Sequence, residues 1–324
     1  MIAIQKYTKI SQLQSLIALF LMCLALALLT DNFMTTDNFW NVLRQISVNV
    51  CISVGMTLVI LTAGIDLSVG SILAFCGAVI AGLLKYGLQF PSQDIYIGFT
   101  VFGAVLAGIL AGGSLGFING FAITKFKVPA FVATLAMLTM ARGFTMLWTQ
   151  GHPITGLGDT FGFLGTGWFL GIPMPVWISG FVVIASIILV RKTRFGRYIY
   201  AIGGNENAAR LSGIPITKVK IWVYALAGML AAVGAILVTA RLDSAQPNAG
   251  VSYELDAIAA VVIGGTSLAG GRGTIIGTVL GAIIIGVLNN GLVLMNVSPF
   301  WQQVIKGIVI LLAVIIDKSN SKNA

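Results

Sequence analysis

Charged side chains are scarce in this sequence of 324 residues, since Asp, Glu, Lys and Arg together make up only 9% of it. An ordinary globular protein carries about 25% charged residues, so the composition excludes a water-soluble surface. Hydrophobic residues make up 57% of the chain, and the mean hydropathy is +0.98. We therefore expect the chain to lie in a lipid bilayer, with membrane lipid covering its apolar surface.

Residues that support enzymatic chemistry are equally rare. His152 is the single histidine, and the three cysteines all lie within apolar segments. The sequence therefore indicates no His/Cys metal cluster, no Ser-His-Asp constellation and no disulfide framework. The pattern G-x-x-x-x-G-K-[ST] is absent as well, so the chain has no P-loop. We expect no enzyme, metal or cofactor here, and any ATP would be hydrolysed by another subunit.

Ten apolar segments are long enough to cross a bilayer, whose core of about 30 Å needs roughly 20 helical residues. The sequence therefore predicts an all-α polytopic membrane protein with about ten transmembrane helices, in a single domain over residues 1–324. Regions 47–85 and 252–293 are each predicted as a helix pair. The predicted spans are 13–30, 47–63, 67–85, 96–123, 128–148, 174–190, 221–240, 252–268, 274–293 and 301–316.

Lysine and arginine are distributed unevenly between the two sides of these spans. The 191–220 stretch alone carries seven of the 19 basic residues, and most of the others fall on the same side. Because short cytoplasmic loops carry the excess of positive charge, both termini are predicted to be cytoplasmic. This distribution also explains the net charge of +9 without nucleic acid as a partner.

The long gap at 191–220 contains a predicted short helix. Gly203-Gly204 can end a preceding helix, Asn205 is a good N-cap, and Gly213 ends the new helix. Such a helix on the cytoplasmic side is a short, rigid projection that another protein can bind. The alternative is a positively charged loop that sets the topology and has no further role.

Several motifs resemble one transporter family. Asn207-Ala-Ala-Arg-Leu-Ser-Gly213 resembles the E-A-A-x-x-x-G loop of bacterial ABC-importer membrane subunits, although Asn207 stands where that pattern has Glu. Gly64-Ile-Asp-Leu-Ser-Val-Gly70 and Gly264-Gly-Thr-Ser-Leu-Ala-Gly-Gly271 are similar to signatures of its ribose-type branch, and the likeness covers nearly the whole chain. In this family the loop is a coupling helix that docks on the ATP-binding subunit. The residues that would couple are Gly203, Gly204, Asn205, Glu206, Asn207, Ala208, Ala209, Leu211, Ser212 and Gly213.

The resemblance implies a permease subunit of the cell inner membrane that passes ribose or a similar monosaccharide inward. In the family, two such subunits pair with an ATP-binding component and a periplasmic sugar-binding protein. One alternative is an ion-coupled secondary transporter, for which Asp66 is the clear titratable candidate within the spans. Others are a membrane enzyme, which lacks a nucleophile–base set, and a paralogous importer for galactose, xylose or another small polyol.

Polar residues within apolar segments are candidates for the translocation path. Asp66 and Ser68 lie between two apolar runs, where a break within the membrane would place them on the path. Alternatively, Asp66 caps the following helix. The amides of Asn289 and Asn290 suit sugar hydroxyls, although hydrogen bonding between helices is their default use.

A second polar group lies on the predicted outer side, between residues 241 and 256. It is expected either to receive the sugar-binding protein or to connect helices, and its contact residues would be Arg241, Asp243, Gln246 and Glu254. Two basic residues within spans, Arg142 and Lys306, are expected to reach the interface or to pair with Asp243, Glu254 or Asp256.

Glycine spacing points to close helix packing. Gly108, Gly112, Gly116 and Gly120 recur every four residues, as do Gly273, Gly277 and Gly281, and small residues on one face let helices approach closely in lipid. The spacing Gly64-x-x-Leu67-x-x-Gly70 also recurs as Gly265-x-x-Leu268-x-x-Gly271, which hints at a duplicated helix-pair motif.

Overall fold

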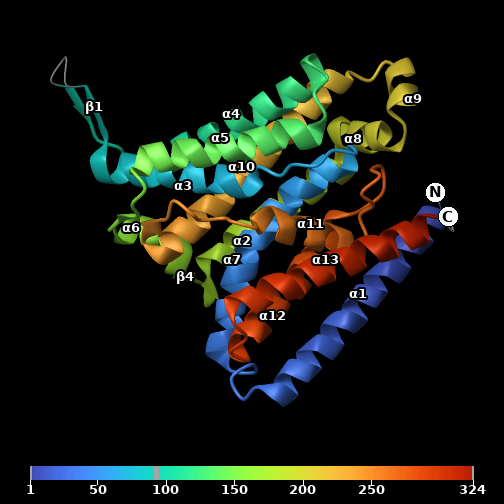
Figure 1. Ribbon diagram of the computed structural model, residues 1–324, viewed down its shortest axis with the longest axis horizontal. Coiled ribbons are helices and arrows are strands. Elements are labelled where there is room, and N and C mark those ends of the chain that lie inside the picture. The colour runs from blue at the N-terminus through green and yellow to red at the C-terminus, as the bar shows by residue number, and fades with distance from the viewer. Residues whose placement is uncertain (1, 91–94, 323–324) are drawn as a thin grey trace. The chain divides into compact units, whose positions relative to one another are not determined.

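The computed structural model describes residues 2–90 and 95–322, and these form 13 helices and three short antiparallel strand pairs (Figure 1). The fold is therefore mostly helical, as predicted, but the strand pairs were not predicted. Residue 1 and residues 323–324, at the chain ends predicted to be cytoplasmic, lie outside the described residues.

Each of the ten predicted spans overlaps one helix. The strands are β1 (Leu88–Phe90) with β2 (Ile95–Ile97), β3 (Ile154–Thr155) with β6 (Ser244–Ala245), and β4 (Trp168–Phe169) with β5 (Ile172–Pro173). The helices are α1 (Ile2–Leu29), α2 (Thr36–Leu61), α3 (Val69–Tyr86), α4 (Val101–Lys125), α5 (Ala130–Thr149), α6 (Asp159–Thr166), α7 (Met174–Lys192), α8 (Arg194–Gly204), α9 (Glu206–Leu211), α10 (Ile216–Leu242), α11 (Tyr253–Ile263), α12 (Ile275–Leu294) and α13 (Pro299–Lys322).

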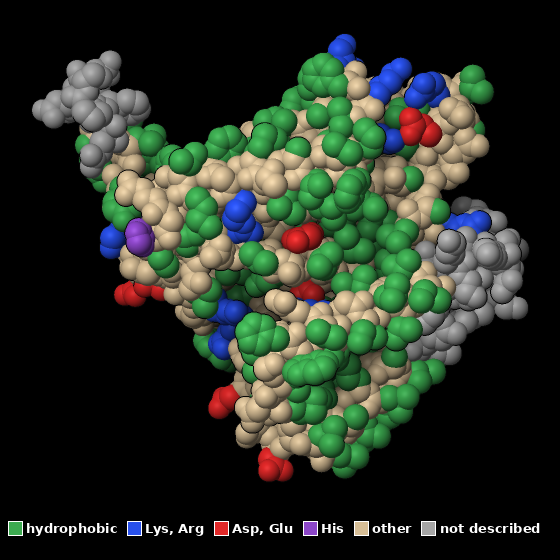
Figure 2. Space-filling view, in the orientation of Figure 1, with side chains coloured by type: hydrophobic (Ala, Val, Ile, Leu, Met, Phe, Trp, Pro, Cys, Tyr) green, Lys and Arg blue, Asp and Glu red, His purple; other side chains and the backbone are tan. Residues whose placement is uncertain are grey.

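Seven helices of the described chain are long and apolar enough to cross a membrane, namely α2, α3, α4, α5, α7, α10 and α12. Two shorter apolar stretches, Ser15–Leu29 and Pro299–Leu312, lie in α1 and α13, and α11 has 11 residues. Hydrophobic side chains are exposed along many of these helices, and charged ones are sparse on the face in Figure 2. The chain is thus a multi-pass membrane protein, and the count of ten spans stays a prediction.

The chain folds into two compact units, and each is assembled from separate stretches of sequence. Unit 1 consists of Met1–Gly64, Phe181–Ile216 and Leu255–Ala324. Unit 2 consists of Ile65–Gly180 and Thr217–Glu254.

Unit 2 is built around α3, α4, α5 and α10, which run alongside one another (Figure 1). The glycine row of α4 faces its neighbours, since Gly112 meets the Gly228 carbonyl and Gly116 meets the Tyr224 carbonyl of α10. No Cβ would fit at either position, which confirms the predicted close packing. At one end of the unit, β3 pairs with β6 above a core that includes the fully buried Phe161.

Unit 1 packs α2 and α1 against α12. Gly281 of α12 meets the Ala260 carbonyl of α11, and Gly286 meets Ile46 of α2. The predicted row of three glycines is wrong at its first member, because Gly273 lies in the loop before α12 begins. Thr274 forms the N-cap of α12, accepting a hydrogen bond from Gly277 N at 3.0 Å, and so sets the start of the helix at Ile275.

Candidate functional site

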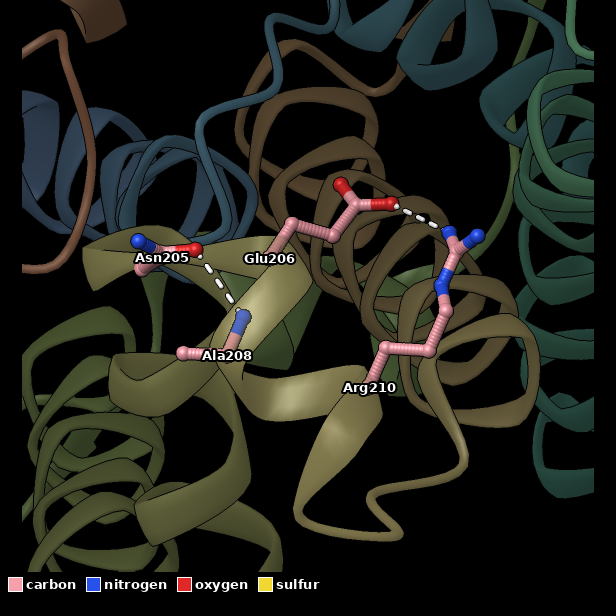
Figure 3. Close-up of polar contacts among 4 residues, drawn as sticks. All are labelled: Asn205, Glu206, Ala208 and Arg210. Carbon is pink, nitrogen blue, oxygen red and sulfur yellow. Dashed lines mark hydrogen bonds and ion pairs between the residues drawn. The ribbon is translucent and has the colours of Figure 1, made fainter.

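The predicted short helix is present as α9, and α8 precedes it directly. We call residues 194–215 the elbow. Asn205 caps α9, with its Oδ1 accepting a hydrogen bond from Ala208 N at 3.0 Å (Figure 3). Glu206 and Arg210 form an exposed ion pair at 3.2 Å, one helical turn apart. The cap and the first-turn carboxylate thus start the helix where the sequence predicted.

The end of α9 also follows the prediction. Gly213 has a φ of +78°, its N–H donates to Arg210 O, and Ile214 N donates to Ala209 O. This left-handed turn closes the helix with a Schellman-type motif, which favours glycine. Of its side chains, Ala209 is buried while Leu211 is 91% exposed. The elbow therefore presents an apolar side chain on a rigid, capped turn.

Two contacts anchor the elbow within unit 1. Gly203 packs against the Leu61 carbonyl at the end of α2, where a Cβ would not fit, and Gly271 N donates to that same oxygen at 3.0 Å. The Tyr200 hydroxyl donates to Gly273 O at 2.8 Å, and burial raises the pKa of this phenol. The elbow is thereby joined to the end of α2 and to the 264–274 loop. Tyr200 was missed by the sequence analysis.

The ten predicted coupling residues lie together in this elbow, across the end of α8, the whole of α9 and the turn after it. They are Gly203, Gly204, Asn205, Glu206, Asn207, Ala208, Ala209, Leu211, Ser212 and Gly213. Their contact with an ATP-binding subunit stays a prediction.

Asp66 and Ser68 form a buried polar cluster in unit 2, just before α3. Asp66 Oδ1 accepts hydrogen bonds from Ser68 N at 2.9 Å and from the Ser68 hydroxyl, and both residues are fully buried. Asn119 Nδ2 of α4 donates to Ser68 Oγ at 2.9 Å. The cluster fixes the entry to α3, and Asn119, which sequence analysis did not single out, completes it. A role for Asp66 and Ser68 on the path stays a prediction.

The neighbouring amides Asn289 and Asn290 have different partners. Asn290 and Asn38 of α2 exchange two hydrogen bonds, at 2.8 and 3.1 Å, so this amide joins two helices. Asn289 Nδ2 approaches Asp256 Oδ2 at 3.5 Å, and Lys306 Nζ binds the same oxygen at 3.0 Å. The predicted pairing of Lys306 with Asp256 is therefore confirmed.

The polar residues predicted to lie on the outer side, between 241 and 256, fall partly at the β3–β6 strand pair and partly in the segment after it. Asp243 Oδ1 accepts a hydrogen bond from Leu157 N at 2.8 Å, which fastens the strand pair. Gln246 is exposed and Glu254 is partly exposed, beyond β6. Within the described part of unit 2, Arg142 makes no hydrogen bond to Asp243; its Nη1 donates to the carbonyls of Pro247 and Ala249.

Most of this chain is similar in sequence to known permease proteins. Residues 38–314 match the family described as "Branched-chain amino acid transport system / permease component". The chain is 52% identical over 308 residues to the ribose import permease protein RbsC of Escherichia coli strain K12, covering 94% of this chain and 92% of that one. It is 50% identical to RbsC of Bacillus subtilis strain 168, again covering 94% and 92%.

A more distant relative is the xylose transport system permease protein XylH of Haemophilus influenzae, 34% identical with 95% of this chain and 96% of that one covered. No solved structure matches the chain. The family match spans most of the sequence, including the elbow, all of unit 2 and most of unit 1. The chain therefore belongs to the family of permease components of branched-chain amino acid type transport systems.

Proposed function

We propose that this chain is the membrane-spanning subunit of an ATP-binding-cassette importer that carries ribose into the cytoplasm. The observation that carries the proposal is 52% identity to a ribose import permease over 94% of the chain. The membrane-length helices and the sparse charge agree with a transport subunit rather than an enzyme. ATP is hydrolysed by a separate subunit, since this chain has no P-loop.

In this proposal the elbow and both termini lie in the cytoplasm, in line with the clustering of basic residues. The ATP-binding subunit contacts the exposed Leu211 and the capped turn around it. A displacement of the elbow is transmitted to the end of α2 by the contact of Gly203 with Leu61. It is transmitted to the 264–274 loop by the hydrogen bond from Tyr200 to Gly273. Alternating access follows if ATP binding favours one arrangement of these elements over the other.

On the periplasmic side, a sugar-binding protein delivers the cargo, and Arg241, Asp243, Gln246 and Glu254 are the proposed contacts. Two copies of the chain form the translocation unit. The polar residues proposed to line the translocation path are Asp66, Ser68, Asn289 and Asn290. Ribose is the first substrate to test, because identity falls from 52% to 34% between the ribose and xylose permeases.

Sugar uptake tests the proposed function directly. The chain is expressed with its ATP-binding subunit and binding protein in a strain without other pentose importers, and labelled ribose, xylose, arabinose and galactose are supplied. We expect ribose uptake that stops on ATP depletion and persists with an uncoupler. Uptake that collapses with the uncoupler alone would instead support ion coupling, and preference for another sugar would reassign the cargo.

Docking of the ATP-binding subunit is tested at Leu211. Placing a carboxylate on an apolar contact costs binding, so Leu211→Asp is expected to weaken association about tenfold or more, as truncation of interface anchors does. Leu170→Asp is the matched control, since Leu170 is 78% exposed in the β4–β5 turn. Equal association of the two variants in co-purification would remove the elbow from the interface.

A further inference from the structure

The segment 246–252 of unit 2 is non-helical although it runs alongside membrane-length helices. It begins after Ala245, which pairs with Ile154, and it ends where α11 starts. Gly250 lies against Gly70 in the first turn of α3, where neither residue has room for a Cβ. The segment therefore passes from the strand pair down to the opposite end of α3.

Arg142 holds this segment in place from within α5. At a rise of 1.5 Å per residue it lies about 18 Å from the start of that helix and about 10 Å from its end. Its Nη1 donates to Pro247 O at 2.6 Å and to Ala249 O at 2.9 Å. Non-helical backbone at membrane depth persists only where protein or water satisfies its polar groups, and the guanidinium supplies that for two carbonyls.

The side chains of the segment alternate in exposure. Pro247 and Gly250 are buried, whereas Gln246 and Asn248 are exposed. An exposed amide at this depth is costly in hydrocarbon, because its hydrogen bonds would be lost. Water on this side of the segment removes the cost. Gln246 and Asn248 thus indicate that the segment borders an aqueous space.

The positive charge of Arg142 is balanced by a nearby carboxylate. The Glu254 carboxylate lies beside Gly70, and it interacts electrostatically with Arg142. Arg142 is partly exposed, and within the described chain its Nε and Nη2 make no hydrogen bond. An anionic cargo would meet the carboxylate and a cationic cargo the guanidinium, so the pair suits a neutral cargo with many hydroxyls.

We propose that Arg142, Gln246, Asn248 and Glu254 form a binding site for the hydroxyl groups of the passing sugar. The guanidinium and the amides donate hydrogen bonds, and the carboxylate and amide oxygens accept them. This site rests on the proposed sugar import, and it moves Gln246 and Glu254 from the contact with the binding protein to the cargo itself. Arg142 also positions the segment that carries both amides.

The test uses the complete importer in vesicles, with labelled ribose, and measures sugar moved per ATP hydrolysed. Asn248→Ala and Gln246→Ala alter exposed side chains and are each expected to lower this ratio about 3- to 10-fold, the equivalent of one hydrogen bond. Glu254→Gln is expected to lower it about tenfold or more, because a charged acceptor is lost. ATPase activity stimulated by the binding protein should persist in the Asn248→Ala importer, since Asn248 is not among the proposed contacts of that protein.

Val251→Ala is the matched control, since Val251 is an exposed apolar residue on the same segment. Its ratio should equal that of the unaltered chain. If Asn248→Ala and Gln246→Ala leave the ratio unchanged, the site does not exist. A parallel fall in uptake and ATPase activity would also overturn it, because a structural role explains that result. Failure of the unaltered importer to move ribose would refute the proposed function instead.

Discussion

Residues 62–68 and residues 264–274 both separate two helices, and they are stabilised by different means. The first break depends on buried side chains, with Asp66, Ser68 and Asn119 bonded in a row. The second depends on backbone bonds, such as Ser267 N to Arg272 O at 2.9 Å. Tyr200 of the elbow donates a hydrogen bond to Gly273 in the second break. Gly203 packs against the Leu61 carbonyl, which accepts a hydrogen bond from Gly271 of the same break. We infer that residues 66–68 are held firmly against α4 within unit 2, and that the 264–274 loop receives motion from the elbow within unit 1.

The helix ends before the two breaks share one backbone pattern. Ala63 and Gly265 have φ values of +58° and +81°. In each case the next residue donates to a carbonyl five positions earlier, Gly64 N to Val59 O and Thr266 N to Val261 O. The same pattern also ends α5, α9 and α12, at Gln150, Gly213 and Asn296. It is therefore a common helix end, and the duplicated motif stays a prediction.

The largest expected effect is at the first break. Asp66→Ala leaves two donors of Ser68 buried without a partner, so we expect unfolding in detergent to be easier by about 3 kcal/mol. Ser267→Ala is the counterpart in the second break. It removes one exposed hydrogen bond, donated by Ala269 N to Ser267 Oγ at 3.3 Å, and about 0.5 kcal/mol is expected. Equal destabilisation in thermal unfolding would remove the distinction between the breaks.

A second variant addresses the contact of the elbow with the end of α2. Gly203→Ala places a methyl group against the Leu61 carbonyl and Gly271 N, so the elbow must shift. We expect transport per ATP to fall about tenfold, the equivalent of about 1.4 kcal/mol. Gly307→Ala of α13 serves as the control, because Gly307 lies outside the elbow and its added carbon meets no neighbouring atom within 4 Å. Identical transport by the two variants would show that the contact carries no motion.

The smallest effect on ribose transport per ATP is expected at the hydroxyl of Tyr200. Tyr200→Phe removes one hydrogen bond to Gly273 O, worth about 1 kcal/mol, so coupling should weaken about fivefold. Tyr198→Phe, on the same helix, is the control, since Tyr198 makes no hydrogen bond within the described residues. Coupling is measured as ribose moved per ATP hydrolysed, and a loss shared by both variants would point to α8 stability instead.

Local features of this fold could be predicted from the sequence. The cap at Asn205 and the turn at Gly213 depend on a few neighbouring residues, and every apolar run became a helix. The pairing of Lys306 with Asp256 was among the predicted contacts, but most contacts between distant residues could not be predicted. Asn119 with Ser68 and Tyr200 with Gly273 join positions that only packing brings together. The strand pairs were missed because two or three residues give no period to detect.

Arg142 illustrates the same limit at the proposed sugar site. The sequence placed an arginine within a span and led us to expect the interface or a carboxylate partner. The structure gives it two backbone carbonyls of a segment more than a hundred positions away. A carbonyl leaves no trace in the sequence, so no pattern of residue types could have identified this partner.

The paired amides of Asn38 and Asn290 have a mechanical consequence for unit 1. Each amide gives one hydrogen bond and takes one, so both break together if α2 slips lengthwise along α12. Apolar side chains tolerate such slippage, whereas this two-way lock fixes a single alignment. A displacement of α2 at Leu61, where the elbow contacts it, therefore moves α12 as well, and the two helices move together as a rigid body.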